Sequence, residues 1–122
     1  MQQVIELYVK AVDLAKQGEG LSNQDKMILN KFKILLLSGA TGDADRELAQ
    51  IGKVRKDTIH KVRELAESFF EDWVRRNADI SDDERERILE DGKKRADTTE
   101  DLIISELKRN GLIIDTIWRL PP

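Results

Sequence analysis

The only two prolines of this 122-residue chain are Pro121 and Pro122, so no proline interrupts a helix before them. Over most of that length apolar residues recur every three or four positions, the spacing that places side chains on one face of a helix. Several of the seven glycines separate these stretches. The pattern predicts an all-α fold: a small bundle of about six helices in a single domain over 1–122, with a possible short C-terminal strand or arm over 112–122.

Capping residues and glycines mark the ends of the expected helices. We expect helices over residues 2–17, 23–38, 43–51, 56–76, 82–97 and 98–110. Ser81 and Glu84 have the spacing of a capping box, which predicts a helix start at residue 82. The stretch that follows holds few apolar residues and is interrupted by Gly92, so we expect a solvated, partly frayed helix there. A separate last helix would then be capped by Thr98 or Thr99.

The stretch 56–76 carries the clearest amphipathic pattern, and its second half is rich in aromatic residues. Phe69, Phe70 and Trp73 follow helical spacing. Aromatic side chains at such spacing pack in a core or against a second protomer far more often than they stack on bases. We expect Phe69 and Trp73 to be core residues, with truncation of either to alanine costing roughly 3–5 kcal/mol.

Composition limits the classes of protein that the chain can belong to. Hydrophobic residues make up 39% and charged residues 37% of it, which with the regular apolar spacing indicates a charged globular protein. The net charge of -3 argues against coating nucleic acid by bulk charge but permits one local basic face. No apolar run approaches the roughly 20 residues that span a bilayer, and residues 1–10 do not resemble a secretory signal. We expect a cytoplasmic protein that does not enter a membrane.

The sequence contains no complete catalytic or metal-binding motif. It has no cysteine, and the single histidine, His60, rules out a multi-histidine metal site. The acids at 43, 45 and 47 alternate as in a calcium loop, but Leu48 and Val54 stand where that loop needs glycine and a bidentate acid. Gly39 and Gly42 lack the lysine and hydroxyl residue of a phosphate-binding loop. We expect no enzyme activity, no cofactor and no metal.

Five apolar or small residues have a spacing that fits two helices crossing steeply. They are Leu48, Ala49, Val54, Ile59 and Val62. A small residue is needed where such helices approach each other, and apolar anchors fix the angle at which the second helix protrudes. The segment resembles the helix-turn-helix of bacterial and phage DNA-binding regulators, which implies a helix-turn-helix over 44–63. It departs from that family in the turn, where the family places its glycine one position after Gly52.

The charges of this segment favour contact with nucleic acid. From residue 44 to residue 63 there are six basic and three acidic side chains, a local charge of +3 in a chain of -3. The turn and the second helix offer hydrogen-bond donors for phosphates and base edges. The predicted nucleic-acid-binding residues are Arg55, Lys56, Thr58, His60 and Lys61. The alternative is that they form only the solvated face of an amphipathic helix.

Two functions remain open. The first is a small DNA-binding regulatory protein that acts on double-stranded DNA as a homodimer, because one module makes few phosphate contacts and a symmetric pair reads two half-sites. The second is a protein-interaction module, such as an inhibitor, an immunity-type protein or an assembly factor, whose acidic surface binds a basic protein partner without binding DNA. For either function, six of the nine residues from 112 to 120 are large and apolar and need a surface to cover, on a second protomer or on the chain's own helices.

Overall fold

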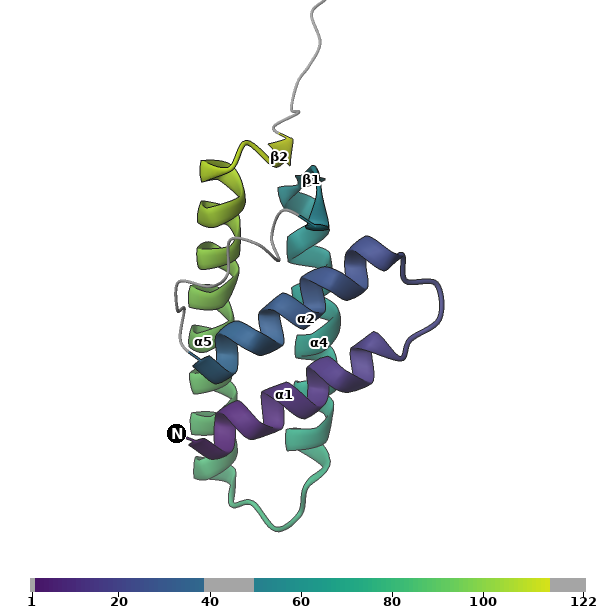
Figure 1. Cartoon of the computed structure of the whole chain (residues 1–122). Helices are drawn as coiled ribbons and strands as arrows, with labels where there is room; N and C mark the ends of the chain where they lie inside the picture. The colour runs from purple at the N-terminus through teal and green to yellow at the C-terminus, as the bar shows by residue number, and fades with distance from the viewer. Residues whose placement is uncertain (1, 39–49, 115–122) are drawn as a thin grey trace, which may run out of the picture.

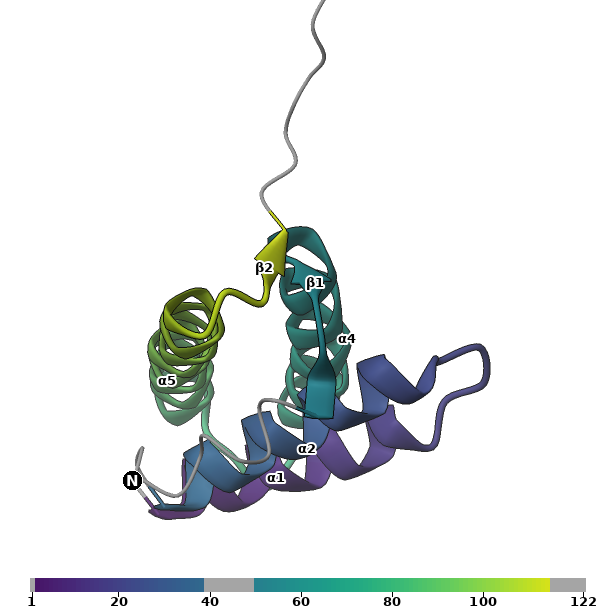
Figure 2. The same cartoon turned by 45° about the horizontal axis from the view of Figure 1, so that its top comes forward.

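The computed structural model describes residues 2–38 and 50–114, and within these ranges the chain forms two helical hairpins. Helices α1 (Gln2–Lys16) and α2 (Asn23–Ser38) make the first hairpin, and α4 (Lys56–Arg76) and α5 (Asp82–Arg109) make the second. The hairpins lie in two layers that cross each other (Figure 1, Figure 2). The all-α prediction is confirmed. The helix expected over 43–51 lies outside the described residues except for its last two, at 50 and 51, which are helical.

The core fills the space between the two layers. Each of the four helices contributes to it, and the largest fully buried side chains include Tyr8, Phe32, Phe70, Ile28, Leu29, Ile59, Ile103 and Leu107. The centroid of the Tyr8 ring lies 4.8 Å from that of Phe70 and 6.4 Å from that of Phe32. Helix α1 is therefore joined to α2 and to α4 through one group of neighbouring aromatic rings.

Helix α5 runs without a break over Asp82–Arg109, which corrects the expectation of two separate helices over 82–97 and 98–110. Ser81 caps it as predicted, because its hydroxyl oxygen accepts from the backbone N–H of Glu84 at 3.2 Å. Thr98 and Thr99 are not caps. Their hydroxyls donate to backbone carbonyls one turn earlier in the same helix, and each of these carbonyls is also the acceptor of a helical N–H bond.

Helix α5 continues through Gly92, and the neighbouring helix α4 uses the space that a side chain at this position would fill. A Cβ atom at Gly92 would overlap the ring of Phe70 on α4. The glycine thus makes room for a core aromatic residue, and the interruption that it suggests in the sequence does not occur.

The aromatic residues of α4 divide between the core and the surface. Phe70 is 1% exposed, whereas Phe69 is 38% and Trp73 is 43% exposed. The expectation that Phe69 and Trp73 are core residues is therefore wrong. Consecutive residues of a helix point about 100° apart, so only one of Phe69 and Phe70 can face the first layer.

A short parallel sheet of two strands, each two residues long, links the segment before α4 to the segment after α5. Strand β1 (Val54–Arg55) pairs with strand β2 (Ile113–Ile114) in the register Val54 to Ile113 and Arg55 to Ile114. Gly111, at a φ of 68°, reverses the chain after α5, and its N–H and the next one donate to carbonyls in the last turn of the helix. The expected C-terminal strand is present, and the rest of the expected arm, at 115–122, lies outside the described residues.

Candidate nucleic-acid interface

The turn before α4 is held against the first layer of helices. Gly52 has a φ of 77°, a left-handed conformation that residues with side chains rarely adopt. The side-chain amide of Gln24 on α2 donates to the carbonyls of Ile51 and Lys53, at 2.8 and 2.9 Å. These bonds and the buried side chain of Val54 fix the place at which α4 begins.

Three of the five expected helix-turn-helix anchors lie within the described residues. They are Val54, Ile59 and Val62, and all three are buried. The other two, Leu48 and Ala49, lie outside the described residues with most of the expected first helix. The buried anchors set the face of α4 that packs inward, so the residues between them on the first two turns face solvent.

Most of the predicted nucleic-acid-binding side chains are on that solvent face. Thr58 is half-buried, and the exposed ones are Arg55, Lys56, His60 and Lys61. Arg55 is the N-cap residue of α4, and no side chain caps the helix there. Its guanidinium pairs with the Asp57 carboxylate, Nη2 to Oδ2 at 3.2 Å, but both groups are well exposed. An ion pair of this kind contributes little stability and can open when another anion competes for the arginine.

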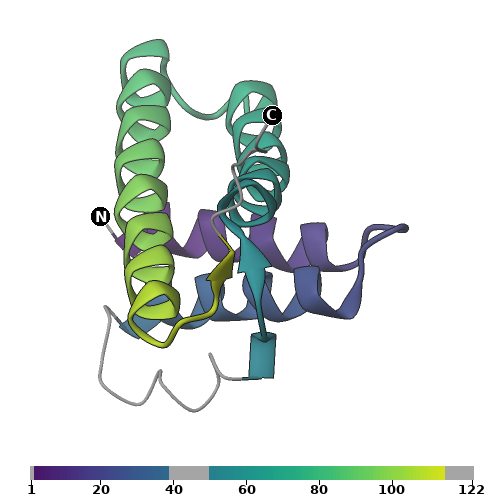
Figure 3. The same ribbon diagram turned by 90° about the horizontal axis from the view of Figure 1, so that it is seen from above.

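The structure brings two further basic residues to the same place from the far end of the sequence. Because α4 and α5 are antiparallel and β1 pairs with β2, the last turn of α5 lies at the end of the hairpin where α4 begins, next to the β1–β2 pair (Figure 3). Lys108 and Arg109 are exposed in that turn. With the exposed basic residues around the start of α4 they form what we call the basic end, which comprises Lys53, Arg55, Lys56, Lys61, Lys108 and Arg109.

Two features of the basic end affect the local charge there. The amino end of a long helix carries a partial positive charge, and that of α4 lies within the basic end. Arg109 is 3.8 Å from a carboxylate oxygen of Glu106, a long contact that leaves the guanidinium accessible. Sequence reasoning missed Lys108 and Arg109 because basic residues are common in the last turn of any helix. Placing them near the start of α4 requires knowing that α4 and α5 pack antiparallel, and the sequence pattern of either helix does not show this.

His60 lies at the edge of the basic end and is held by two carboxylates. Its Nε2 is 2.6 Å from Glu64, and its Nδ1 is 3.0 Å from Glu100 on α5. The hydrogen bond with Glu100 raises the pKa of His60 above its usual value, with support from the charges of both acids and against the effect of partial burial. The imidazole therefore bridges α4 and α5, and its two nitrogen atoms face acids rather than open solvent.

Arg63 contributes to the charge of the segment 44–63 but not to its surface. Its side chain is 5% exposed and lies between α4 and α5, where its guanidinium pairs with Glu67, Asp97 and Glu100 at 3.0, 2.7 and 3.1 Å. Removing one partner of such a buried network leaves an uncompensated charge. Arg63 therefore helps to hold α4 against α5. The groove beside it is about 450 Å³ in volume, and four of its eight lining residues are carboxylates, including Glu64 and Glu71; Arg63 and Lys93 line it as well.

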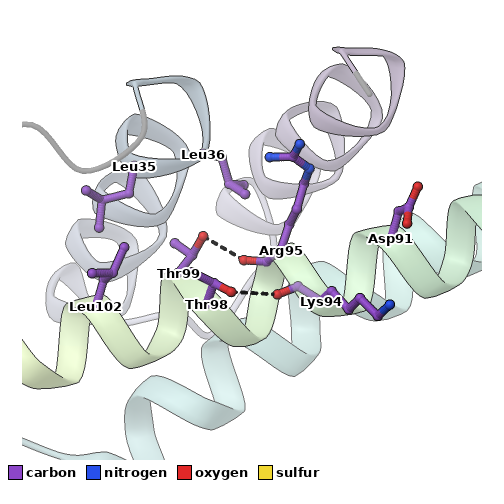
Figure 4. A pocket seen from close by; sticks show the side chains of 8 residues that line it. All are labelled: Leu35, Leu36, Asp91, Lys94, Arg95, Thr98, Thr99 and Leu102. Atoms are coloured by element: carbon purple, nitrogen blue, oxygen red, sulfur yellow. Dashed lines mark hydrogen bonds between the residues drawn. The ribbon is translucent and has the colours of Figure 1, made fainter.

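A second hollow, about 300 Å³ in volume, lies between α2 and α5 (Figure 4). Leu35, Leu36 and Leu102 supply its apolar part. The two hydroxyls on its wall, from Thr98 and Thr99, are engaged with backbone carbonyls of α5. Its lining contains no histidine or serine, and we assign no chemistry to it.

Comparisons with family models, with curated proteins and with solved structures each find no match to this chain. In residues 2–38 and 50–114, no group of three or more histidine, aspartate or glutamate side chains is arranged to hold a metal ion. Over the same ranges, none of the helices has both the length and the apolar character needed to cross a membrane.

Proposed function

We propose that this chain is a small DNA-binding regulatory protein that binds double-stranded DNA through the basic end and acts as a homodimer. The observation that carries the proposal is the gathering of six exposed basic side chains at the end of the molecule where α4 begins, four from residues 53–61 and two from the last turn of α5. Phosphate groups are bound by this combination of lysine and arginine side chains with a helix amino terminus. Such a regulator would act in the cytoplasm of a bacterial cell.

A helix-turn-helix over 44–63 is the proposed scaffold of this interface. It is supported by the burial of Val54, Ile59 and Val62 and by the left-handed Gly52, which suits a tight turn between two helices. In this scheme α4 is the recognition helix. Arg55, Lys56 and Lys61 contact phosphates or base edges, and Thr58 and His60 lie on the same two turns.

The proposal is tested by titrating a fluorescent random-sequence duplex with the protein and measuring anisotropy at two salt concentrations. Replacing Arg55, Lys56 and Lys61 together by alanine should weaken binding by roughly tenfold or more. It should also reduce the slope of log affinity against log salt by about 3, since each lost phosphate contact removes about 0.9. The melting temperature should change little because these charges are exposed.

A matched control removes three positive charges from elsewhere on the same hairpin. Arg75, Arg87 and Lys93 are exposed, and they lie nearer the turn that joins α4 to α5 than the basic end does. Replacing these three by alanine should leave the salt slope unchanged. The proposal fails if the two triple variants weaken binding equally, or if the wild-type protein does not bind duplex at low salt.

The acidic groove between α4 and α5 favours the second function, a protein-interaction module that binds a basic partner. Glu64, Glu71 and Asp97 border it, and Glu67 lies deeper. In that case the protein would bind an oligolysine peptide instead of duplex, and replacing Glu64 and Glu71 by glutamine would weaken the peptide complex. In the same anisotropy experiment, the first function therefore predicts binding of the negatively charged duplex, and the second predicts binding of the positively charged peptide.

A further inference from the structure

A hollow of about 600 Å³ lies where the first hairpin meets residues 50 and 51. The described residues that line it come from the last turn of α1, from α2 and from the two helical residues before the turn at Gly52. Its polar lining residues all carry hydrogen-bond donors, and they are Lys16, Asn23, Lys26, Asn30, Lys31 and Gln50. We call this hollow the lysine pocket. It shares no residue with the basic end.

The charge of the lysine pocket differs from that of two other hollows on the molecule. Among its lining residues that the structure describes, three are lysines and none is an acid. By contrast, the groove beside Arg63 is lined by four carboxylates, and the hollow between α2 and α5 includes Asp91. Ammonium and amide N–H groups without a competing carboxylate favour an oxyanion as the ligand.

One hydrogen bond determines the orientation of an amide in the lysine pocket. The Lys16 ammonium donates to Oδ1 of Asn30 at 3.3 Å. Because an ammonium group only donates, the oxygen of this amide faces Lys16, and the Nδ2 group keeps its N–H donors for another acceptor. Lys26 lies one turn earlier on α2, is exposed, and forms no ion pair with the described residues. Lys26 and Asn30 are therefore available to an anion from solvent.

The donors of the lysine pocket suit phosphate better than carboxylate. Arginine is the side chain that matches a planar carboxylate with a bidentate fork, whereas lysine binds phosphate as a point charge. The described lining has lysines and amides but no arginine. These donors come from three segments of the chain, as the tetrahedral arrangement of phosphate oxygens requires.

The size of the lysine pocket fits a ligand larger than a bare ion. Pockets for small ligands measure about 300–1,000 Å³, and the volume of the lysine pocket lies within this range. Met27 and Ile51 also line it, so apolar side chains adjoin the donors. A phosphate group attached to a sugar has both properties, because its oxygens accept hydrogen bonds and the sugar carbons are apolar.

We infer that the lysine pocket binds the phosphate group of a phosphorylated ligand. That group belongs either to the backbone of duplex DNA or to a free phosphorylated small molecule. The backbone is one source because Gln24 on α2 bonds the carbonyls of Ile51, in the lysine pocket, and Lys53, in the basic end, so the two places are neighbours. The inference itself does not depend on the proposed function.

Nuclear magnetic resonance of the full chain with inorganic phosphate tests the inference. At constant ionic strength, phosphate should shift the side-chain amide signal of Asn30 to saturation. Lys26→Gln should weaken this binding roughly tenfold, because it removes a charged hydrogen-bond donor. Lys10→Gln is the matched control, since Lys10 is an exposed lysine of the first hairpin outside the lysine pocket, and it should bind phosphate as the wild type does. Asn30→Asp adds a carboxylate and should abolish the shift of the Asn23 amide signal.

The salt dependence of duplex binding identifies the source of the phosphate group. If a backbone phosphate occupies the lysine pocket, Lys26→Gln should reduce the slope of log affinity against log salt by about 0.9, and Lys10→Gln should leave it unchanged. A fall in this slope supports the backbone as the source even if inorganic phosphate alone does not bind. If the slope is unchanged while inorganic phosphate binds, the ligand is a free phosphorylated molecule.

The outcomes separate this inference from the proposed function. The inference is overturned if Lys26→Gln matches Lys10→Gln in both measurements, or if Asn30→Asp binds phosphate as tightly as the wild type. Phosphate binding in the lysine pocket of a protein that does not bind duplex supports the inference and overturns the proposed function. Duplex binding that requires Arg55, Lys56 and Lys61 but not Lys26, without phosphate binding in the lysine pocket, has the opposite meaning.

Discussion

Replacing Gly92 by alanine should destabilise the protein, although the same change stabilises most exposed helical positions. Gly92 is buried in the middle of α5, and the added Cβ would overlap the ring of Phe70. That ring is 1% exposed and packs against Tyr8, so it cannot turn aside without disturbing the core around it. Either α5 moves away from α4 or the aromatic group is repacked.

Two opposing contributions set the change in the free energy of unfolding that Gly92→Ala causes. Alanine is favoured over glycine within a helix by about 1 kcal/mol. Overpacking of a filled core costs about 1–3 kcal/mol, and the immobile Phe70 ring places the cost near the upper end of that range. The net loss should be about 1–2 kcal/mol, or a fall in melting temperature of roughly 5 °C for a domain of this size.

Urea unfolding followed by circular dichroism measures the difference. Ser105→Ala is the control, because Ser105 is exposed on the same helix and gains helix propensity without a clash. The reasoning is refuted if Gly92→Ala is stabilised as much as Ser105→Ala. Leucine is smaller than phenylalanine and leaves room for the new Cβ atom. The double variant Gly92→Ala/Phe70→Leu should therefore lose less free energy of unfolding than the sum of the losses of the two single variants.

Two further predictions follow from burial and charge. The ion pairs of His60 with Glu64 and Glu100 raise its pKa above 6.5, so their contribution to stability is complete below that pH and is lost as the pH rises through the raised value. The stability difference between wild type and His60→Gln should therefore be larger at pH 5.5 than at pH 9, and equal differences would contradict the bridging role. Phe70→Ala should cost roughly 3–5 kcal/mol and Trp73→Ala much less in dilute protein, as measured by urea unfolding; similar losses would show that Trp73 is a core residue after all.

The elements that local sequence could predict are those whose ends are determined locally. Ser22 lies three residues before Asp25, the spacing of a capping box with a shorter acid. The structure contains both of its hydrogen bonds, between each backbone N–H and the other side chain. The start of α5 follows from Ser81 in the same way. The continuity of α5 could not be predicted, because the reason for Gly92 is an aromatic ring on another helix.

The candidate site shows the same division between local and distant information. The exposure of Lys56 and Lys61 follows from the helical phase of buried residues on α4. The arrival of Lys108 at the same end of the molecule and the contact of His60 with Glu100, forty positions later in the sequence, depend on how α4 packs against α5. No periodicity within either helix contains that information.

The β1–β2 contact has a consequence for the order in which the molecule folds. Val54 and Ile113 are 59 residues apart, and closing so long a loop for two backbone pairs costs more chain entropy than forming either helical hairpin. The hairpins and their shared core therefore form first, and the strand pairing follows. The antiparallel α4–α5 hairpin already carries the last turn of α5 to the end of the molecule where α4 begins. The basic side chains of that end therefore come close together as the hairpin forms, and the later strand pairing only fixes the segments that flank them.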